Sequence, residues 1–282
     1  MPTTKVKQGG TFKTVTAMEV KQGGTWKSVL TGSVKQGGAW KPFFQRTYNL
    51  VISSNTNRIY LSSLLNAQQK SGDVVVTINS GVYVYSTITN GPAFITGNDI
   101  AGTLTIINNG YIYGAGGAGG TGGNPSSGNG GNGGTGGTGL DVQMNILLTN
   151  NGSILGGGGG GGGGAGGNDD QTGSDHDFAG GGGGGGGQSM GAAGVRNSTC
   201  SGSGCTRASA NGGAGTITAR GAGGVGALAG GRADAGSGGN GGLVGQAGSN
   251  GSVGSPNNDH NGGAGSGGSA GAGIVTNGHS IS

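Results

Sequence analysis

Two uninterrupted glycine tracts lie near the middle of the sequence, GGGGGGGGG at residues 156–164 and GGGGGGGG at residues 180–187. The chain has 282 residues, of which 79 are glycine and only 5 are proline. A glycine tract has no side chain to bury, and its backbone loses much entropy on ordering, so order requires backbone hydrogen bonds. An extended polyproline-II conformation leaves every glycine N–H free to donate to a neighbouring strand. We therefore predict a bundle of parallel and antiparallel polyglycine-II strands, joined sideways by backbone hydrogen bonds, over residues 114–282.

The glycine runs alternate with short polar loops, and their order predicts a path. If apolar β segments lie at one end, called proximal, outward and return runs must alternate until the chain comes back. About ten runs fit this rule: 114–123, 128–139, 156–167, 180–187, 188–194, 211–219, 221–231, 236–245, 246–254 and 261–273. Five distal loops then join them: 124–127, 168–179, 195–210, 232–235 and 255–260.

These loops contain nearly all of the charge of the glycine-rich region and both cysteines. A uniform scaffold that displays varied polar loops at one end is typical of a recognition surface. The candidate recognition residues are Asn124, Pro125, Asp169, Asp170, Asp175, His176, Asp177, Phe178, Arg196, Asn197, Arg207, Arg232, Asp234, Asn257, Asn258, Asp259 and His260.

Cys200 and Cys205 lie in the longest distal loop. A disulfide between them would contribute about 2 kcal/mol in the chain-entropy model, and two free thiols are the alternative. Two thiols alone cannot form a structural zinc site. The acidic residues of loop 168–179 could ligate a hard cation, but their spacing matches no EF-hand loop, so no metal site is predicted.

The segment 47–113 predicts β structure. DVVVTINSGVYVYS (73–86) and TLTIINNGYIY (103–113) are rich in β-branched and aromatic residues around an Asn-containing turn. Related phrases return as ILLTNNGSIL (146–155) and IVTNGHSI (274–281). Since Asn-Gly is a strong hairpin signal, we expect hairpins and a chain that returns repeatedly to one β layer. LSSLLNAQQK (61–70) predicts a short helix.

The N-terminal end contains a repeat of 14 residues: KVKQGGTFK (5–13), EVKQGGTWK (19–27) and SVKQGGAWK (33–41). Gly-Gly between β-type segments predicts hairpins. We expect valine and the aromatic residue on one face and lysine on the other. Such small hairpins must stack on each other or on a partner, so residues 1–46 are a self-contained module or a docking module. The docking interpretation assigns attachment to Phe12, Trp26, Trp40, Lys13, Lys27 and Lys41.

The charge is divided unevenly along the chain. Residues 1–46 hold seven lysines and Arg46 against Glu19, whereas the remainder holds six bases and nine acids. A basic end could contact nucleic acid, but the repeat already accounts for the lysines, so no nucleic-acid partner is predicted. No apolar run approaches the roughly 20 residues that span a bilayer, and no secretion signal is visible.

No enzyme motif is present. GxGxxG strings are expected by chance from so many glycines, and no glycine tract continues into the Lys-Ser or Lys-Thr of a P-loop. The loop carboxylates could perform acid/base chemistry, but nothing indicates a substrate cleft. We predict no catalytic residues and no cofactor.

The tracts Gly156–Gly164 and Gly180–Gly187, broken by polar loops, resemble the adhesins at the tips of long tail fibres of some T-even-like phages. The resemblance implies a polyglycine-II sandwich whose hypervariable distal loops bind outer-membrane proteins. SGVYVYS and NNGYIYGAGGAGG, within residues 48–120, are similar to segments of other phage tail and host-specificity proteins. The VKQGGTWK repeats are similar to N-terminal modules of phage structural proteins.

The resemblance gives the following expectations. Residues 1–46 attach the chain to other tail-fibre or baseplate proteins, 47–113 form a β shoulder, and 114–282 form the sandwich that binds a bacterial outer-surface receptor, protein or glycan. The chain would be made in the host cytoplasm and act at the fibre tip, without membrane insertion, as a homotrimer or as a monomer on a trimeric fibre. The alternatives are a non-adhesive fibre or decoration subunit and, more distantly, a cellular glycine-rich matrix protein, against which the lack of a signal peptide argues.

Overall fold

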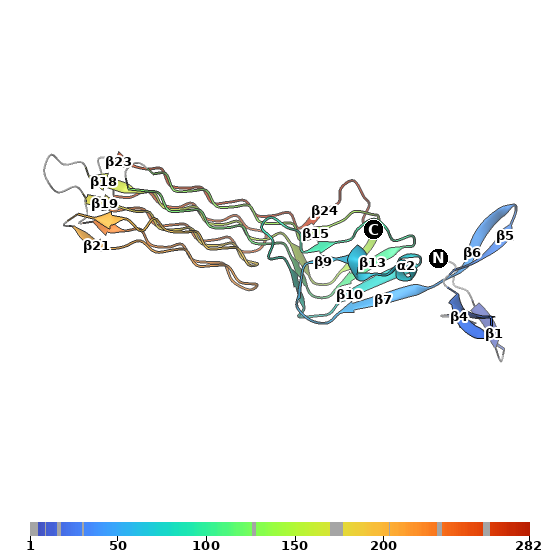
Figure 1. Cartoon of the computed structure of the whole chain (residues 1–282). Helices are drawn as coiled ribbons and strands as arrows, with labels where there is room; N and C mark the ends of the chain where they lie inside the picture. The colour runs from blue at the N-terminus through green and yellow to red at the C-terminus, as the bar shows by residue number, and fades with distance from the viewer. Residues whose placement is uncertain are drawn as a thin grey trace.

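The computed structural model describes residues 5–8, 10–15, 18–29, 31–125, 128–169, 177–202, 204–229, 233–255 and 260–282. The described chain is mainly β, with two four-residue helices, α1 (Leu61–Leu64) and α2 (Ala67–Lys70). Figure 1 shows an elongated molecule with hairpins near the N-terminus, parallel sheets in the middle and long extended runs that end in short strands.

Each N-terminal repeat forms one antiparallel hairpin in a separate two-stranded sheet. The strands are β1 (Lys5–Gln8) with β2 (Thr11–Thr14), β3 (Met18–Gln22) with β4 (Thr25–Val29), and β5 (Thr31–Gln36) with β6 (Ala39–Gln45). At Gly23 and Gly24 φ is 60° and 83°. This left-handed conformation at both central positions is what a two-residue type I′ turn requires.

The predicted placement of side chains on the hairpins is wrong. Val20 pairs with Lys27, and Lys21 pairs with Trp26. Directly opposed residues share a face, so the valine and the aromatic residue lie on opposite faces, each beside a lysine. The reason is the turn: a two-residue loop opposes residues an odd number of positions apart, whereas Val20 and Trp26 are six apart.

The middle of the molecule consists of stacked coils, in which each coil passes once through three parallel sheets. The sheets have the strand orders β16-β13-β10-β7, β17-β14-β11-β8 and β24-β15-β12-β9, and every pairing in them is parallel. The first sheet contains β7 (Thr47–Ile52), β10 (Asp73–Ile78), β13 (Leu104–Asn108) and β16 (Ile146–Asn150). The second contains β8 (Thr56–Asn57), β11 (Tyr83–Tyr85), β14 (Tyr111–Tyr113) and β17 (Ser153–Leu155). The third contains β9 (Ile59–Tyr60), β12 (Phe94–Ile95), β15 (Leu140–Asp141) and β24 (Ile274–Val275).

The hairpins expected around the asparagine-containing turns are therefore also wrong. The strands on either side of Asn108-Asn109-Gly110 belong to different sheets, and each pairs with the matching strand of the next coil. The Asn108 amide donates to Asn150 Oδ1 at 2.8 Å, and the Asn151 amide donates to Asn109 Oδ1 at 2.9 Å. These asparagines bond from coil to coil at a corner, so the repeated phrases mark repeated coils.

The core of the coils is made by alternate residues of the parallel strands. Val74, Val76, Val84, Leu104, Ile106, Ile112 and Leu140 are completely buried. In β13 the buried Leu104, Ile106 and Asn108 alternate with half-exposed Thr105 and Ile107. Because this alternation has the period of a strand, the corners can bring all three sheets around one apolar interior.

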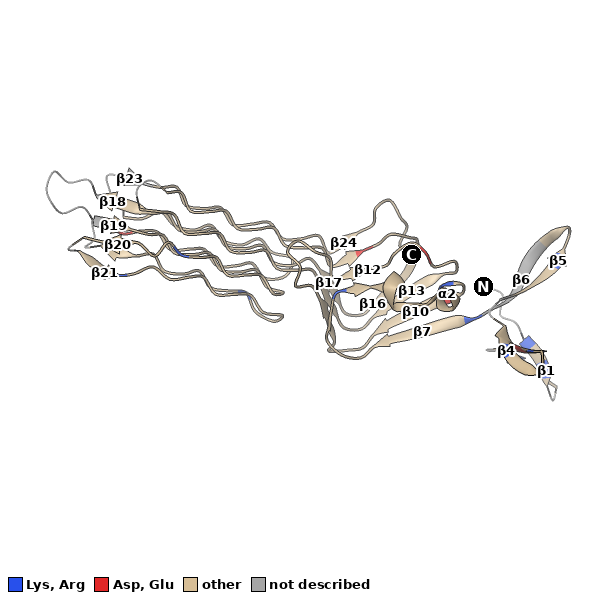
Figure 2. Ribbon diagram, in the orientation of Figure 1, with Lys and Arg blue, Asp and Glu red and all other residues tan. Residues whose placement is uncertain are grey.

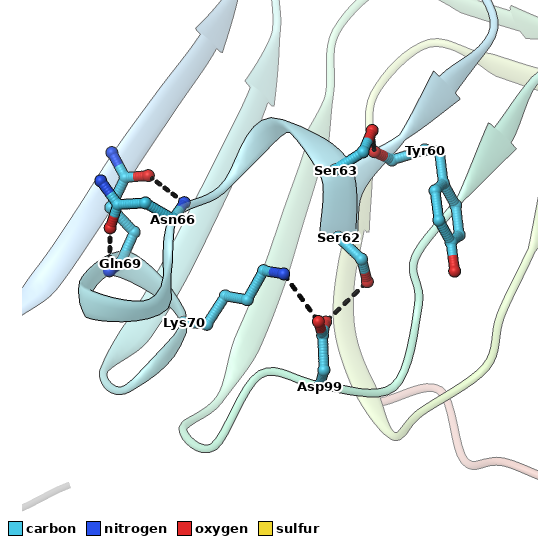
Figure 3. Close-up of polar contacts among 7 residues, drawn as sticks. All are labelled: Tyr60, Ser62, Ser63, Asn66, Gln69, Lys70 and Asp99. Carbon is cyan, nitrogen blue, oxygen red and sulfur yellow. Dashed lines mark hydrogen bonds and ion pairs between the residues drawn. The ribbon is translucent and has the colours of Figure 1, made fainter.

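The helix expected over residues 61–70 is divided into α1 and α2. The first ends at Leu64, with Leu65 in an extended conformation. Asn66 caps the second, because its side chain accepts from Gln69 N and the Gln69 side chain accepts from Asn66 N. Beside them, Asp99 accepts from Lys70 Nζ at 2.7 Å and from Ser62 Oγ at 2.6 Å (Figure 3). The hydrogen bond from Lys70, followed by that from Ser62, lowers the pKa of Asp99. These two hydrogen bonds connect α1 and α2 to the loop after β12, in which Asp99 lies.

The glycine-rich segments leave the coils at one corner. Residues 114–139 lie between β14 and β15, and residues 156–273 lie between β17 and β24. Both excursions thus start after the second sheet and return to the third. The chain does come back to the β layer after each long excursion, and Figure 1 shows the runs lying side by side.

Backbone hydrogen bonds join the runs with a period of three residues. Gly157, Gly160 and Gly163 donate to Gly137, Gly134 and Gly131, while Gly158, Gly161 and Gly164 donate to Gln188, Gly185 and Gly182. Gly159, Gly162 and Ala165 donate to Gln246, Ser249 and Ser252, and all nine distances lie between 2.8 and 3.1 Å. Consecutive N–H groups of one run therefore point to three different neighbours.

The two pure glycine tracts occupy the most enclosed positions. Carbonyls of residues 157–165 also accept from residues 117–123, 236–242 and 265–271, so backbone surrounds the tract on all sides. At every glycine of 156–164 and 180–187, an added Cβ would lie closer than 3.0 Å to a neighbouring backbone atom. Uninterrupted glycine is therefore the sequence that this packing demands.

The outer runs carry side chains only where space exists. In residues 262–273, Gly262, Gly265 and Gly268 are buried, whereas Ser266, Ser269 and Ala272 are exposed. Where an outer N–H has no backbone acceptor, an asparagine side chain serves instead: Ser266 N donates to Asn132 Oδ1 at 2.9 Å and Gly267 N donates to Asn250 Oδ1 at 2.9 Å.

Candidate functional site

The structure gathers the loop segments at the end of the glycine runs remote from the coils. Four strands form one antiparallel sheet in the order β20-β19-β18-β23. They are β18 (Gly167–Asp169), β19 (Asp177–Ala179), β20 (Cys200–Ser201) and β23 (His260–Asn261). In Figure 1 these strands lie at the far left, opposite the coils. Three segments far apart in the sequence therefore share one sheet at the tip.

A second small sheet lies beside the first. It pairs β21 (Cys205–Arg207) with β22 (Leu228–Ala229). A disulfide between Cys200 and Cys205 joins the two sheets covalently. The interior between them is a cluster of small side chains, in which partly buried Cys200 packs on Ala179, Ala227, Ala229, Ala233 and Ala235. Only small residues suit a site where backbones approach this closely.

Asn124 and Gly128, on either side of the middle of the predicted loop 124–127, lie at the same end. Gly128 N donates to Asn124 O at 3.0 Å, Gly166 N donates to Gly128 O at 3.1 Å, and Gly262 N donates to Gly166 O at 3.2 Å. These bonds place the turn next to β18 and β23. Asn124 is exposed and Pro125 is buried.

Two of the candidate arginines, Arg196 and Arg207, donate hydrogen bonds to backbone carbonyls at the tip. Arg196 Nη1 donates to Ser209 O at 2.7 Å, and Arg207 Nη2 donates to Gly226 O at 2.9 Å. Both residues remain exposed. A guanidinium has five N–H donors, so one bond to a carbonyl leaves donors that a ligand can use.

Other candidate residues also support the loop backbone. Asn197 Oδ1 accepts from Thr199 N at 3.2 Å, and Asn197 O accepts from Ser209 Oγ. Asp234 Oδ1 accepts from Ala229 N at 3.0 Å, which ties the loop after β22 back to that strand. Phe178 is half-buried opposite Ser201.

Part of the candidate set lies outside the described residues: Asp170, Asp175, His176, Arg232, Asn257, Asn258 and Asp259. Asp169, Asp177 and His260 are placed by their backbones in β18, β19 and β23. Among the described residues, no group of His, Cys, Asp and Glu side chains could hold a metal ion. Within the same part of the chain, no helix has the length and apolar character that crossing a bilayer takes.

Sequence reasoning missed three exposed valines, of which Val195 begins the predicted loop 195–210 and Val225 and Val253 lie in predicted runs. Val195, Val225 and Val253 are 61%, 41% and 59% exposed. Gly122 N donates to Val195 O at 2.8 Å and Ala210 N donates to Val225 O at 2.9 Å, which sets both near the distal turns. Val253 directly follows Ser252, which accepts from Ala165 N next to β18. For Val225 and Val253, a β-branched residue inside a glycine run was the available signal.

Charge is concentrated away from the glycine runs. Figure 2 shows few Lys, Arg, Asp or Glu residues along the runs between tip and coils. The runs therefore present a neutral surface, and the polar variety of the region is at its distal end.

The candidate attachment residues lie on the N-terminal hairpins. Trp26 is 63% exposed, and Lys13 and Lys27 are exposed as well. The registers place Phe12 opposite Lys7, Trp40 opposite Lys35, and Lys41 opposite Val34. Among the described residues, none covers the β3–β4 hairpin closely enough to bury the side chain of Trp26.

The sequence and the structure were compared with those of known proteins. The family model described as "Phage tail fibre adhesin Gp38" matches residues 47–282. The crystal structure of the gp37-gp38 adhesin tip complex of the bacteriophage S16 long tail fiber is similar, with a TM-score of 0.50 and 27% sequence identity. The similarity covers 84% of this chain and 79% of that chain. No curated protein sequence matches the chain significantly.

Proposed function

Because the chain belongs to the Gp38 family of phage tail fibre adhesins, and is a receptor-binding adhesin of the virion tail, we propose that it recognises its bacterial receptor through the five distal loops. The observation that carries this proposal is the tip itself. Segments 167–169, 177–179, 200–201 and 260–261 meet in one sheet. Loops on a rigid scaffold are the usual place for binding residues.

The candidate loop residues divide into two roles in this proposal. Arg196, Arg207, Asn197 and Asp234 shape the loops through bonds to backbone atoms, and the exposed parts of the two arginines contact the receptor. Val195 and Val253 add exposed apolar surface at the same end. A protein receptor or a glycan receptor would each suit this mixture of donors and apolar surface.

The scaffold beneath the loops is proposed to be polyglycine II. The three-residue period of the hydrogen bonds supports this, because a polyproline-II helix has three residues per turn and no internal hydrogen bonds. The exclusion of Cβ atoms from the two central tracts supports it as well. The resulting bundle would hold the tip at a fixed distance from the coils.

Residues 1–46 are proposed to attach the chain to other tail-fibre or baseplate proteins. They lie outside the family match, at the end of the molecule opposite the tip (Figure 1). The related structure is a complex of two tail-fibre proteins, gp37 and gp38. On this proposal the coils, which residues 47–113 form together with 140–155 and 274–275, are the shoulder between attachment and recognition. The adhesin would bind without catalysing a reaction, and it would be synthesised in the host cytoplasm before assembly into the virion.

Competition for phage adsorption tests the proposal. The full-length chain is added to host cells before phage, and the variant replaces residues 200–205 with a Gly-Ser segment of equal length. The control replaces the proximal turn 216–219 in the same way, since Thr216 N and Ala219 O close that turn away from the tip. We expect the wild type and the control to block adsorption and the tip variant to lose at least about tenfold in potency, corresponding to 1.4 kcal/mol of binding free energy.

Equal potency of the tip variant and the wild type, both shown to be folded, would contradict the assignment of the site. Treating the cells separately with protease and with periodate then identifies the receptor class. Protease-sensitive binding indicates a protein receptor, and periodate-sensitive binding indicates a glycan.

A further inference from the structure

We propose that residues 1–46 bind three equivalent sites on the virion partner, one for each hairpin, and that each site pairs an apolar slot with acidic groups. This inference rests on the proposed attachment role of residues 1–46. It adds the number of contacts, their equivalence and the chemistry of the partner surface.

The first observation is the identity of the repeated unit. The segments 6–13, 20–27 and 34–41 share VKQGG, a small residue, an aromatic residue and lysine in the same order. In each hairpin the registers oppose the first lysine to the aromatic residue: Lys7 to Phe12, Lys21 to Trp26 and Lys35 to Trp40. The three hairpins therefore share one backbone register, which opposes a lysine to an aromatic residue in each.

The second observation is that the hairpins do not form a common sheet. Each is a separate two-stranded sheet. Val6, Val20 and Val34 are 51–52% exposed, and Trp26 is 63% exposed. A single two-stranded hairpin is marginally stable in water, and exposed tryptophan is a common anchor of protein interfaces. Each hairpin therefore needs a partner surface that covers its apolar side chains. Because the three hairpins have nearly the same sequence, we infer that the partner offers three similar sites.

The third observation is the charge. Seven lysines and Arg46 stand against Glu19 in residues 1–46. Lys27 Nζ donates to Gln22 Oε1 at 3.1 Å on one face, and Lys21 stands beside Trp26 on the other. An aromatic residue flanked by lysine is complementary to an apolar slot with carboxylates at its rim. Acidic protein is accordingly the partner that this surface fits.

Three linked contacts have a consequence for affinity. Once one hairpin is bound, the others bind intramolecularly at a high effective concentration. Three weak contacts therefore give a high overall affinity. A partner with three copies of one site, either in a symmetric oligomer or in its own repeats, would supply this arrangement.

Virions assembled with variant chains test the inference. The three variants are Lys7→Glu with Phe12→Ala, Lys21→Glu with Trp26→Ala, and Lys35→Glu with Trp40→Ala. The readout is the amount of the chain that stays on purified particles after washing at increasing salt. We expect each variant to lower retention by a similar factor of at least about ten, and any two combined to abolish it.

The matched control replaces the same lysines by arginine and keeps the aromatic residues, and it should retain the chain at wild-type level. Adsorption competition by each free variant confirms that its tip is folded. Loss of retention from one hairpin alone, with the other two neutral, would overturn the equivalence of the sites. Wild-type retention after deletion of residues 1–46 would instead overturn the attachment role itself, so the two failures are distinguishable.

Discussion

The coils and the glycine bundle obey opposite packing rules within one chain. In the coils, buried side chains such as Ile106 and Leu140 fill the interior between the sheets. In the bundle, the interior of residues 156–164 and 180–187 has no side chains, and an added Cβ would collide with backbone. A large-to-small change is therefore the damaging one in the coils, and a small-to-large change is the damaging one in the bundle.

The largest expected effect is in the centre of the bundle. Gly161→Val would drive its side chain into the backbone of Gly239 and Asn240. Since overpacking costs about 1–3 kcal/mol and sometimes more, and here the obstacle is backbone on all sides, we expect a loss of about 3 kcal/mol or more. Urea unfolding of the full-length chain measures it.

Gly263→Ala is the control for that change. Its Cβ would meet only the Asn129 side chain, at 3.3 Å. We expect a stability near that of the wild type. Equal losses from both substitutions would show that the bundle does not distinguish inner from outer glycines.

The next effect is a cavity in the coils. Ile106→Ala removes a completely buried side chain from β13, and such changes cost about 2–5 kcal/mol. Ile107→Ala, one residue further on the outward side of the same strand, should cost clearly less. A reversed order of the two midpoints would contradict the inside-outside alternation of the sheet.

A smaller effect concerns the corner asparagines. Asn108 is completely buried, and its amide donates to Asn150 Oδ1 while its Oδ1 accepts from Gly110 N. Asn108→Ala leaves these groups without their partner, at a cost of about 1–3 kcal/mol. The more exposed Asn109→Ala serves as the comparison. Hydrogen exchange of the Gly110 N–H, which donates to Asn108 Oδ1, should rise only in the Asn108 variant.

In the bundle, losing the asparagine acceptor of an outer run should cost less stability than losing Asn108 in the coils. Asn132→Ala removes the acceptor of Ser266 N, which water can replace because Asn132 lies at the surface. We expect about 1 kcal/mol or less. A cost above that of Asn108→Ala would mean that the side-chain acceptors, rather than the backbone ladder, hold the bundle together.

The smallest expected effect depends on pH. The pKa of Asp99 is lowered by its hydrogen bonds from Lys70 and Ser62, so the folded state favours the carboxylate. That contribution is present at neutral pH and disappears as the pH falls through the folded pKa, which lies below the usual aspartate pKa. The midpoint difference between the wild type and Asp99→Asn should therefore be small at pH 7 and vanish in acid. A difference that grows on acidification would contradict this sign.

The sequence predicted some of these features because they depend on local chemistry. Gly23-Gly24 specifies its turn by backbone conformation alone. The glycine tracts have no side chains to pack, so they predict a region held together by backbone hydrogen bonds. The alternation of outward and return runs followed from the returning phrases at 146–155 and 274–281.

Other features depend on partners distant in the sequence. Asn108 lies in a turn in either interpretation, but its hydrogen bond to Asn150 decides between hairpin and coil. The face shared by Val20 and Lys27 follows from the register and not from composition. At the tip, Arg196 and Arg207 were recognised by type, whereas their bonds to Ser209 and Gly226 require the three-dimensional arrangement of the loops.

The three-residue period of the bundle also limits which insertions and deletions the glycine runs can accept during evolution. Inserting one or two residues into a run would rotate every later N–H away from its acceptor and turn outward side chains such as Ser266 into the packed interior. Inserting three residues in an outward run, with three in its return run, would keep the N–H groups of both runs in phase with their neighbours and move the loop that joins them further out. Length variation among tips of this design should therefore come in steps of three residues per run, while loops beyond the runs can vary in any number.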